Sequence, residues 1–131
     1  MLDASKAYSG FAVNDLDQAK RFYGETLGLE IKDLDVGAPE PLLELEVGGR
    51  QILIYPKPDL EPANYTILNF AVDDIDAAVD GLAERGVQFE RYEGFEQDDK
   101  GVARGRAANR GPDIAWFKDP AGNILAVLQD G

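Results

Sequence analysis

The hydrophobic pattern of this chain changes from a two-residue period to a helical period once in each half. Tyr8–Val13 alternates in the manner of a strand, and apolar residues then recur at helical spacing. The apolar stripes that follow are Leu16, Ala19, Phe22, Tyr23 and Leu27 in the first half, and Ile75, Ala78, Leu82 and Ala83 in the second. Each half is therefore predicted to contain a strand followed by an amphipathic helix.

An internal repeat marks the same change in both halves. The stretches 11–19 (FAVNDLDQA) and 70–78 (FAVDDIDAA) are identical at six of nine positions. Asp15 and Asp74 stand where a helix N-cap belongs, and Gly28 and Gly86 are placed to end the two helices. Capping explains the acidic residues of the first turns better than a carboxylate cluster does. The repeat therefore predicts a duplicated module.

Three strand-like segments follow each predicted helix. They are Leu29–Leu34, Leu42–Val47 and Arg50–Tyr55 in the first half, and Val87–Glu93, Asp113–Lys118 and Asn123–Gln129 in the second. Gly48-Gly49 is typical of a hairpin turn, and the stretch 119–122 (DPAG) is typical of a type I turn. The pattern predicts an α+β fold of two tandem βαβββ modules. Module one is 1–56, the linker 57–64 and module two 65–131; the stretch Gly94–Pro112 is expected to form a mobile loop, with a lid as one reading.

Composition narrows the possible functions. A chain of 131 residues with 44% hydrophobic residues fits one domain with a packed core. The formal net charge of −12 argues against binding nucleic acid or an anionic membrane surface, and no stretch is apolar enough to span a bilayer. Without cysteine or histidine, thiolate or imidazole ligands and Ser-His-Asp or Cys-His catalysis are excluded. A cytoplasmic location is expected by default.

The order, spacing and duplication of these motifs resemble one known family. The motif that runs from Val13-x-Asp15-Leu16 to Leu27-Gly28-Leu29, and the second βαβββ unit with its 119–123 turn (DPAGN), are similar to the vicinal oxygen chelate superfamily. That superfamily includes glyoxalase I, extradiol dioxygenases, metal-dependent fosfomycin-resistance enzymes and metal-free bleomycin-binding proteins. The resemblance implies a curled mixed sheet around a cavity, and it leaves the function open.

The resemblance also implies where metal ligands would lie. In this chain the family's ligand positions fall on Tyr8, Ile67 and Ala126, with Ile54 the best match for the fourth. A divalent ion needs several oxygen or nitrogen donors that converge. We therefore expect no metal ion and no other cofactor.

Strand alternation places Tyr8 on one face and Ile67 and Asn69 on the matching face of the other module, and the resemblance implies that these faces line the cavity. With the nearby aromatic residues and one small residue, the candidates for ligand binding are Tyr8, Tyr55, Ile67, Asn69, Tyr92, Trp116 and Ala126. Asn69 and Tyr8 are the best polar anchors, because a polar group in a cavity needs a partner. The alternative is that the aromatic residues simply fill the interior or a dimer interface.

Two hypotheses for function remain. The first is a metal-free protein that binds or sequesters an aromatic or antibiotic-like compound. The acidic residues that could steer a cation are Glu93, Glu96, Asp98 and Asp99, although a solvated flexible loop explains them better. The second is an enzyme of lyase, isomerase or dioxygenase type acting on a small carbonyl or carboxylate substrate. Tyr8 would then serve as an acid or hydrogen-bond donor, and Arg104, Arg106 or Arg110 as anion clamps. No nucleophile or general base is identified, so catalytic residues stay unassigned and the first hypothesis is preferred.

A third possibility is a regulatory or subunit role without a ligand. Open four-stranded sheets have edges that need covering. A homodimer is expected for this reason, either swapped or side by side.

Overall fold

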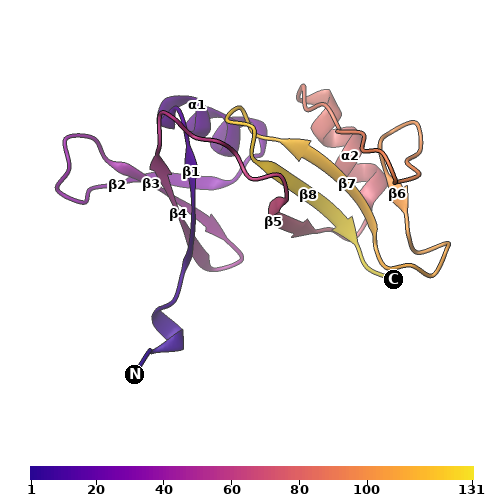
Figure 1. Cartoon of the computed structure of the whole chain (residues 1–131), viewed down its shortest axis with the longest axis horizontal. Helices are drawn as coiled ribbons and strands as arrows, with labels where there is room; N and C mark the ends of the chain where they lie inside the picture. Colours follow the sequence, from indigo (N-terminus) through magenta and orange to yellow (C-terminus); the bar gives the residue numbers. More distant parts are fainter. The chain divides into compact units, whose positions relative to one another are not determined.

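The computed structural model describes all 131 residues, and they form two compact units, Met1–Glu61 and Pro62–Gly131. Each unit contains a four-stranded mixed sheet (Figure 1). The α+β class and the tandem βαβββ modules predicted from the pattern are confirmed.

The first unit follows the predicted order closely. A short 3₁₀-helix, η1 (Ala4–Lys6), precedes β1 (Ser9–Val13) and α1 (Leu16–Arg21), which continues as the π-helix η2 (Phe22–Thr26). The strands β2 (Glu30–Leu34), β3 (Leu42–Val47) and β4 (Arg50–Pro56) complete a sheet of order β1-β4-β3-β2. Only the pair formed by the edge strand β1 and its neighbour β4 is parallel. The N-cap at Asp15 is confirmed, because its carboxylate accepts a hydrogen bond from Gln18 N at 3.1 Å.

The helix covers one face of this sheet. Phe11 of β1 contacts the ring of buried Tyr23 at 5.7 Å between centroids, and Lys20 of α1 reaches Asp33 of β2 at 3.0 Å. Leu43, Leu45, Ile52 and Ile54 share this face by strand alternation and are buried. The opposite face of the sheet, called the open face below, carries the other set of side chains.

The second unit repeats the topology. Its elements are β5 (Thr66–Ala71), α2 (Ile75–Glu84), β6 (Ala103–Arg104), β7 (Asp113–Lys118) and β8 (Ile124–Gln129). The sheet order β5-β8-β7-β6 has β5/β8 as its parallel pair. Asp74 caps α2 by accepting from Ala77 N at 3.1 Å, and Gly86 follows the helix with a φ of 90°.

Helix α2 lies on the face that carries the odd-numbered residues of β8. Gln129 Oε1 accepts a hydrogen bond from Ile75 N at 3.0 Å, which ties the start of α2 to that face. Leu125 and Val127 of the same face are buried, and Phe117 pairs with Leu125 and is 1% exposed. The even-numbered residues, among them Ala126 and Trp116, therefore belong to the open face of the second sheet.

The predicted strand Val87–Glu93 is not formed, and this expectation was wrong. Only an isolated bridge, Phe89 with Phe117, remains of it. The side chain of Gln97 takes the backbone groups that a ladder would use: Oε1 accepts from Tyr92 N at 2.9 Å, and Nε2 donates to Glu90 O at 2.8 Å. The place beside β7 is therefore filled by two separate pieces, Phe89 and the two-residue strand β6.

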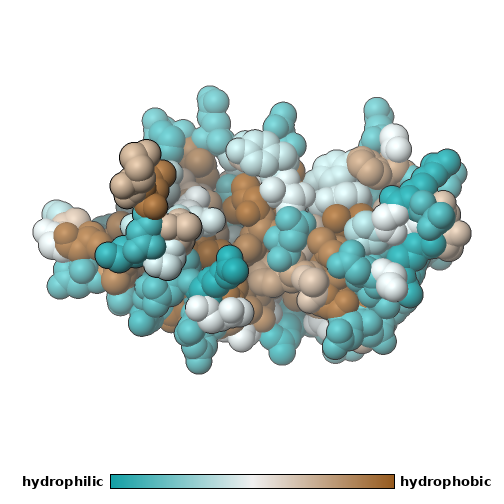
Figure 2. All heavy atoms as spheres, turned by 90° about the horizontal axis from the view of Figure 1, so that it is seen from below, coloured by the Kyte–Doolittle hydropathy of each residue, from teal (hydrophilic) through white to brown (hydrophobic).

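The stretch expected to be an unstructured loop, Gly94–Pro112, contains β6 and a network of internal contacts. Gly101 and Val102 are buried, and Asp98 N donates to Val102 O at 2.8 Å across a tight turn. None of the helices is both long and apolar enough to cross a membrane. On the face drawn in Figure 2, hydrophilic side chains are abundant and hydrophobic atoms show between them.

Candidate functional site

The pairing registers place equivalent residues on the two open faces. In the first sheet Leu53 lies between Gly10 of β1 and Glu44 of β3. In the second sheet Ala126 lies between Asn69 of β5 and Trp116 of β7. Trp116 thus stands in the second module where Glu44 stands in the first. The two open faces share a backbone plan and differ in their chemistry.

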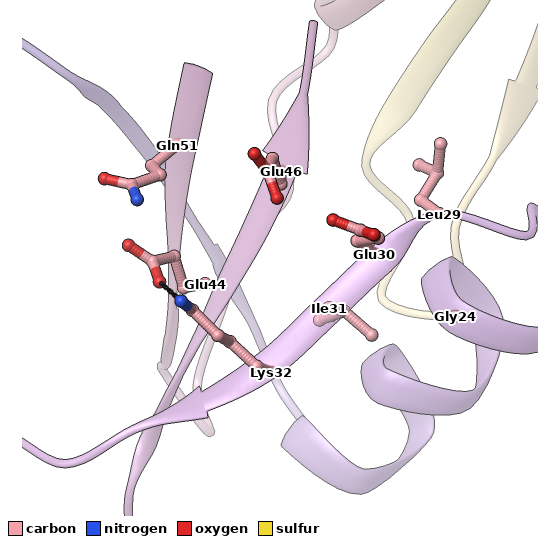
Figure 3. A pocket seen from close by; sticks show the side chains of 8 residues that line it. All are labelled: Gly24, Leu29, Glu30, Ile31, Lys32, Glu44, Glu46 and Gln51. Carbon is pink, nitrogen blue, oxygen red and sulfur yellow. Dashed lines mark ion pairs between the residues drawn. The ribbon is translucent and has the colours of Figure 1, made fainter. Parts of the chain in front are cut away.

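The open face of the first sheet carries a polar cavity of about 520 Å³ (Figure 3). It is lined by Gly24, Leu29, Glu30, Ile31, Lys32, Glu44, Glu46 and Gln51. Lys32 reaches Glu44 at 3.2 Å across the β2/β3 pair, and Figure 3 shows the polar side chains standing on the same side of β2, β3 and β4. The face is therefore dominated by carboxylates.

Two of these carboxylates lie opposite each other, and the nearby charge of Lys32 does not fully offset their interaction. Glu30 and Glu46 are directly opposite in the β2/β3 register. A side-chain hydrogen bond with Glu30, together with its charge, raises the pKa of the Glu46 carboxyl above its ordinary value. Cross-strand carboxylates of this kind disfavour each other once both are ionised. The pair makes this face sensitive to pH.

The open face of the second sheet is aromatic and apolar. Trp116, Ile124 and Ala126 form a buried cluster, and Tyr92, Ala103 and Ile114 pack against it. The Tyr92 ring meets Trp116 edge-on with centroids 5.6 Å apart, and the Phe95 ring lies 5.0 Å from Trp116. Phe95 remains 55% exposed. These three rings, Tyr92, Phe95 and Trp116, are called the aromatic face below.

The aromatic face contains one unsatisfied polar atom. The hydroxyl of Tyr92 is buried and has no hydrogen-bond partner. Burial raises the pKa of the Tyr92 phenol above its ordinary value, and the charge of Glu90 adds to this effect. The group therefore stays a neutral phenol at physiological pH, able both to donate and to accept.

The positions at which the family resemblance would place metal ligands do not fit a divalent ion. Ile67 and Ala126 carry hydrocarbon side chains, and Tyr8 alone offers an oxygen. The registers show that Leu53, not Ile54, is equivalent to Ala126; Ile54 is fully buried on the helix side. No group of three or more carboxylate, imidazole or thiol side chains in the structure is arranged to hold a metal ion.

The predicted ligand-binding residues divide between the two units. Asn69, Trp116 and Ala126 share the open face of the second sheet, with Tyr92 packed against Trp116. Ile67 lies in β5 where the register with β8 shifts.

Tyr8 and Tyr55 belong to the first unit. Tyr8 directly precedes β1 and is 71% exposed, and Tyr55 of β4 pairs with Ala12. Phe95 was missed, although a lone aromatic residue in a polar, glycine-containing loop is a signal that it has a contact to make.

Two of the three arginines expected as anion clamps, Arg104 and Arg106, are engaged by carboxylates. Arg104 contacts Asp76 at 2.7 Å and Asp98 at 2.8 Å, and Arg106 lies 3.7 Å from buried Asp113. The hydrogen bond from Arg104 holds the pKa of Asp76 below its ordinary value. For Asp98, burial opposes ionisation, but hydrogen bonds from Val102 N and Arg104 outweigh it and lower the pKa. These contacts count against an anion site formed by Arg104 and Arg106.

Comparison with known proteins identifies a matching family and several solved structures of similar fold. A family model described as Glyoxalase/Bleomycin resistance protein/Dioxygenase superfamily matches residues 7–127. Among solved structures, TnmS3, an antibiotic binding protein from Streptomyces sp. CB03234, is 25% identical with a TM-score of 0.67, over 99% of this chain and 100% of that one. A glyoxalase/bleomycin resistance protein from the same organism is 26% identical with a TM-score of 0.61, over 94% and 100% of the two chains.

A third similar structure, from Sphaerobacter thermophilus DSM 20745, is described as a member of the same superfamily. It is 24% identical with a TM-score of 0.67, over 95% of this chain and 97% of that one, and so supports the fold alone. No curated protein matches the chain significantly.

Proposed function

The chain belongs to the glyoxalase/bleomycin resistance protein/dioxygenase superfamily, and on this premise we propose that it binds a small aromatic compound on its aromatic face without a metal ion. The family resemblance of the sequence motifs is confirmed by the family match. Members of one superfamily differ in chemistry, so the proposal depends on the site.

The buried hydroxyl of Tyr92 is the observation that carries the proposal. A buried hydroxyl without a partner is costly, and native proteins rarely leave one unsatisfied. It lies on a ring packed against Trp116, so a compound that covers the rings and displaces the side chains over the hydroxyl can also pair with it. An apolar surface with a few polar anchors is the usual composition of a small-molecule site.

Charge favours a neutral or cationic compound over an anion. Arg104 and Arg106 are already paired with carboxylates, and the chain has a net charge of −12. Exposed Phe95 beside Trp116 offers ring faces to which a cation is attracted. The alternative hypothesis of an enzyme with a carboxylate substrate therefore has less support than the binding hypothesis.

The similar proteins support the same direction. TnmS3 is described as an antibiotic binding protein, and its similarity extends over nearly the whole of this chain. We propose by analogy that the ligand here is an antibiotic-like aromatic compound. A homodimer and a cytoplasmic location stay predictions; sedimentation analysis would test the first.

Tyr92→Phe tests the proposal most directly. Aromatic antibiotics, cationic and anionic, would be titrated into the protein and binding followed by calorimetry and by the fluorescence of Trp116, the single tryptophan of the chain. Loss of the hydroxyl should lower the affinity for the compound about 5- to 10-fold, because one hydrogen bond disappears. The stability of the free protein should be unchanged or slightly higher, because the unsatisfied group is gone.

Tyr55→Phe, which removes a hydroxyl from the open face of the first sheet, is the matched control and should leave affinity unchanged. Saturable binding that is insensitive to Tyr92→Phe and Trp116→Phe would refute a site on the aromatic face. Absence of binding by every aromatic compound in the panel would count against the function itself.

A further inference from the structure

We infer that Arg104 is a positioning residue that fixes the aromatic face by fastening the 94–112 segment to α2 and β7. The segment carries Phe95 and the Gln97 side chain that orients Tyr92. The inference rests on the proposed function for its importance in binding, but the structural coupling can be tested without any ligand.

Arg104 joins three parts of the second unit. Its guanidinium forms a two-pronged contact with Asp76 in the first turn of α2, with Nη2–Oδ1 at 2.7 Å and Nη1–Oδ2 at 3.2 Å. Its Nε donates to Asp98 Oδ2 at 3.0 Å, within the segment itself. Nη1 also lies 3.6 Å from Asp113 at the start of β7. A planar fork with several donors suits this geometry, and a lysine ammonium does not.

The second carboxylate oxygen of Asp98 transmits this restraint to the turn that follows. Asp98 Oδ1 accepts from Lys100 N at 3.0 Å and from Val102 N at 2.9 Å, which closes the 98–102 turn. Asp98 is therefore held from both sides, by its own turn and by Arg104.

Gln97, which directly precedes Asp98, connects the 98–102 turn to the aromatic rings. Gln97 donates to Gly101 O at 2.7 Å inside the turn, and it accepts from Tyr92 N at 2.9 Å outside it. Phe95 N in turn donates to Tyr92 O at 3.4 Å. A path of hydrogen bonds, joined through the backbone of the 98–102 turn, thus runs from Asp76 on the helix to Tyr92 and Phe95 beside Trp116.

Lys100 forms a second set of ion pairs between the 94–112 segment and α2. Lys100 reaches Asp80 at 3.0 Å and Asp76 at 3.4 Å, so it ties the same turn to α2. Both cations remain partly exposed, with 36% of the Arg104 side chain and 41% of the Lys100 side chain accessible. Contacts of this kind are weakened by salt. The order of the aromatic face should therefore depend on ionic strength.

This arrangement links electrostatics at the helix to ligand affinity. If the segment detaches in a fraction of molecules, only the remaining fraction presents Phe95 and Tyr92 together. The apparent Kd rises in proportion as the binding-competent fraction falls. Arg104 would thus set affinity without touching the ligand.

Hydrogen exchange of the ligand-free protein tests the inference. In Arg104→Gln, amides of residues 95–102 should exchange about ten-fold faster than in the unmodified protein, because their local opening becomes easier. Amides of β8 should keep their rates, and acrylamide should quench Trp116 more strongly. Arg104→Lys keeps the charge but not the fork, and should fall between the two.

Arg110→Gln removes the same charge from an exposed position of the same segment and is the control. Equal exchange of residues 95–102 in Arg104→Gln, Arg110→Gln and the unmodified protein would overturn the inference. If Arg104→Gln also speeds exchange in β8, Asp76→Asn and the unmodified protein in 1 M NaCl decide the matter: faster exchange confined to residues 95–102 supports the coupling, and unchanged exchange refutes it. Because no ligand is added, these outcomes are independent of whether the proposed function holds.

Discussion

Glu44 and Trp116 occupy equivalent positions in the two sheets, each between a central strand and the edge. Around Glu44 the open face holds Lys32, Glu46 and a polar cavity. Around Trp116 it holds aromatic rings and a buried hydroxyl. The helix-covered faces show no such contrast at their centres, since Leu45 and Ile52 in the first sheet and Phe117 and Leu125 in the second are all buried. Duplication has kept the side of each sheet that folds the module and has let the other side diverge.

The edge strands diverge as well. In the first module β2 runs unbroken along β3 for five residues. In the second, the corresponding place beside β7 is shared by Phe89 and β6, and the Gln97 side chain bonds to backbone groups of the chain between them. The interruption is what brings Tyr92 and Phe95 to Trp116. A local departure from the shared plan therefore creates the surface on which the proposed function depends.

The largest expected effects test whether the helix-covered cores of the two modules are packed equally well. Leu45 and Phe117 are equivalent by register and are 0% and 1% exposed. Leu45→Ala should cost about 2–5 kcal/mol of unfolding free energy and Phe117→Ala about 3–5 kcal/mol, because each leaves a cavity. Denaturant unfolding followed by circular dichroism measures both. Phe95→Ala, which truncates an exposed ring, should cost only about 1 kcal/mol.

A large cost at only one of the two core positions would mean that the modules are not equally packed. That result would contradict the conclusion that the helix-covered faces of the two sheets are alike.

Removing the Gln97 side chain should have an intermediate effect on the free energy of unfolding. Gln97→Ala should cost about 1–3 kcal/mol, because Tyr92 N, Glu90 O and Gly101 O lose their partner at once. Gln51→Ala, on the exposed open face of the first sheet, should stay within about 0.5 kcal/mol. Thermal unfolding of the two variants gives the difference. Similar values for both would show that the interrupted strand does not depend on this side chain.

The carboxylate pair of the first sheet should give the smallest effect, and one that depends on pH. Because the pKa of Glu46 is raised in the folded protein, the folded state binds the proton more tightly than the unfolded chain does. The associated stability is present at low pH and is lost as the pH rises from about 4 towards 7.

Glu46→Gln should therefore melt at a higher temperature than the unmodified protein at pH 7 and at the same temperature at pH 3. Glu40→Gln, in the exposed 35–41 connection, should show no such dependence. A Glu46→Gln advantage that persists at pH 3 would point to a cause other than repulsion from Glu30.

Much of the fold could be predicted because local rules and the repeat agree. The caps at Asp15 and Asp74, the Gly48-Gly49 hairpin and the 119–122 turn all form where short-range chemistry favours them. The strand β3 begins and ends at the predicted residues. The structure also brings three of the predicted cavity residues, Asn69, Trp116 and Ala126, to one face.

The features that the sequence pattern missed depend on side-chain contacts that strand alternation does not reveal. Val87–Glu93 has strand-like composition, but a glutamine side chain replaces its ladder, and alternation carries no sign of that. Ile54 was assigned to the family's fourth ligand position, one residue away from Leu53, since register cannot be read within the apolar run 52–54. The Arg104 contacts join residues 28 positions apart, beyond the reach of any local motif.

The brevity of β6 also has a consequence for association. An unbroken outer strand presents a row of free amide and carbonyl groups to which another polypeptide can add. With only Ala103 and Arg104 in that position, the outer side of the second sheet offers little room for such an addition. A neighbouring chain that extends a sheet sideways would find a longer template along β2 of the first unit.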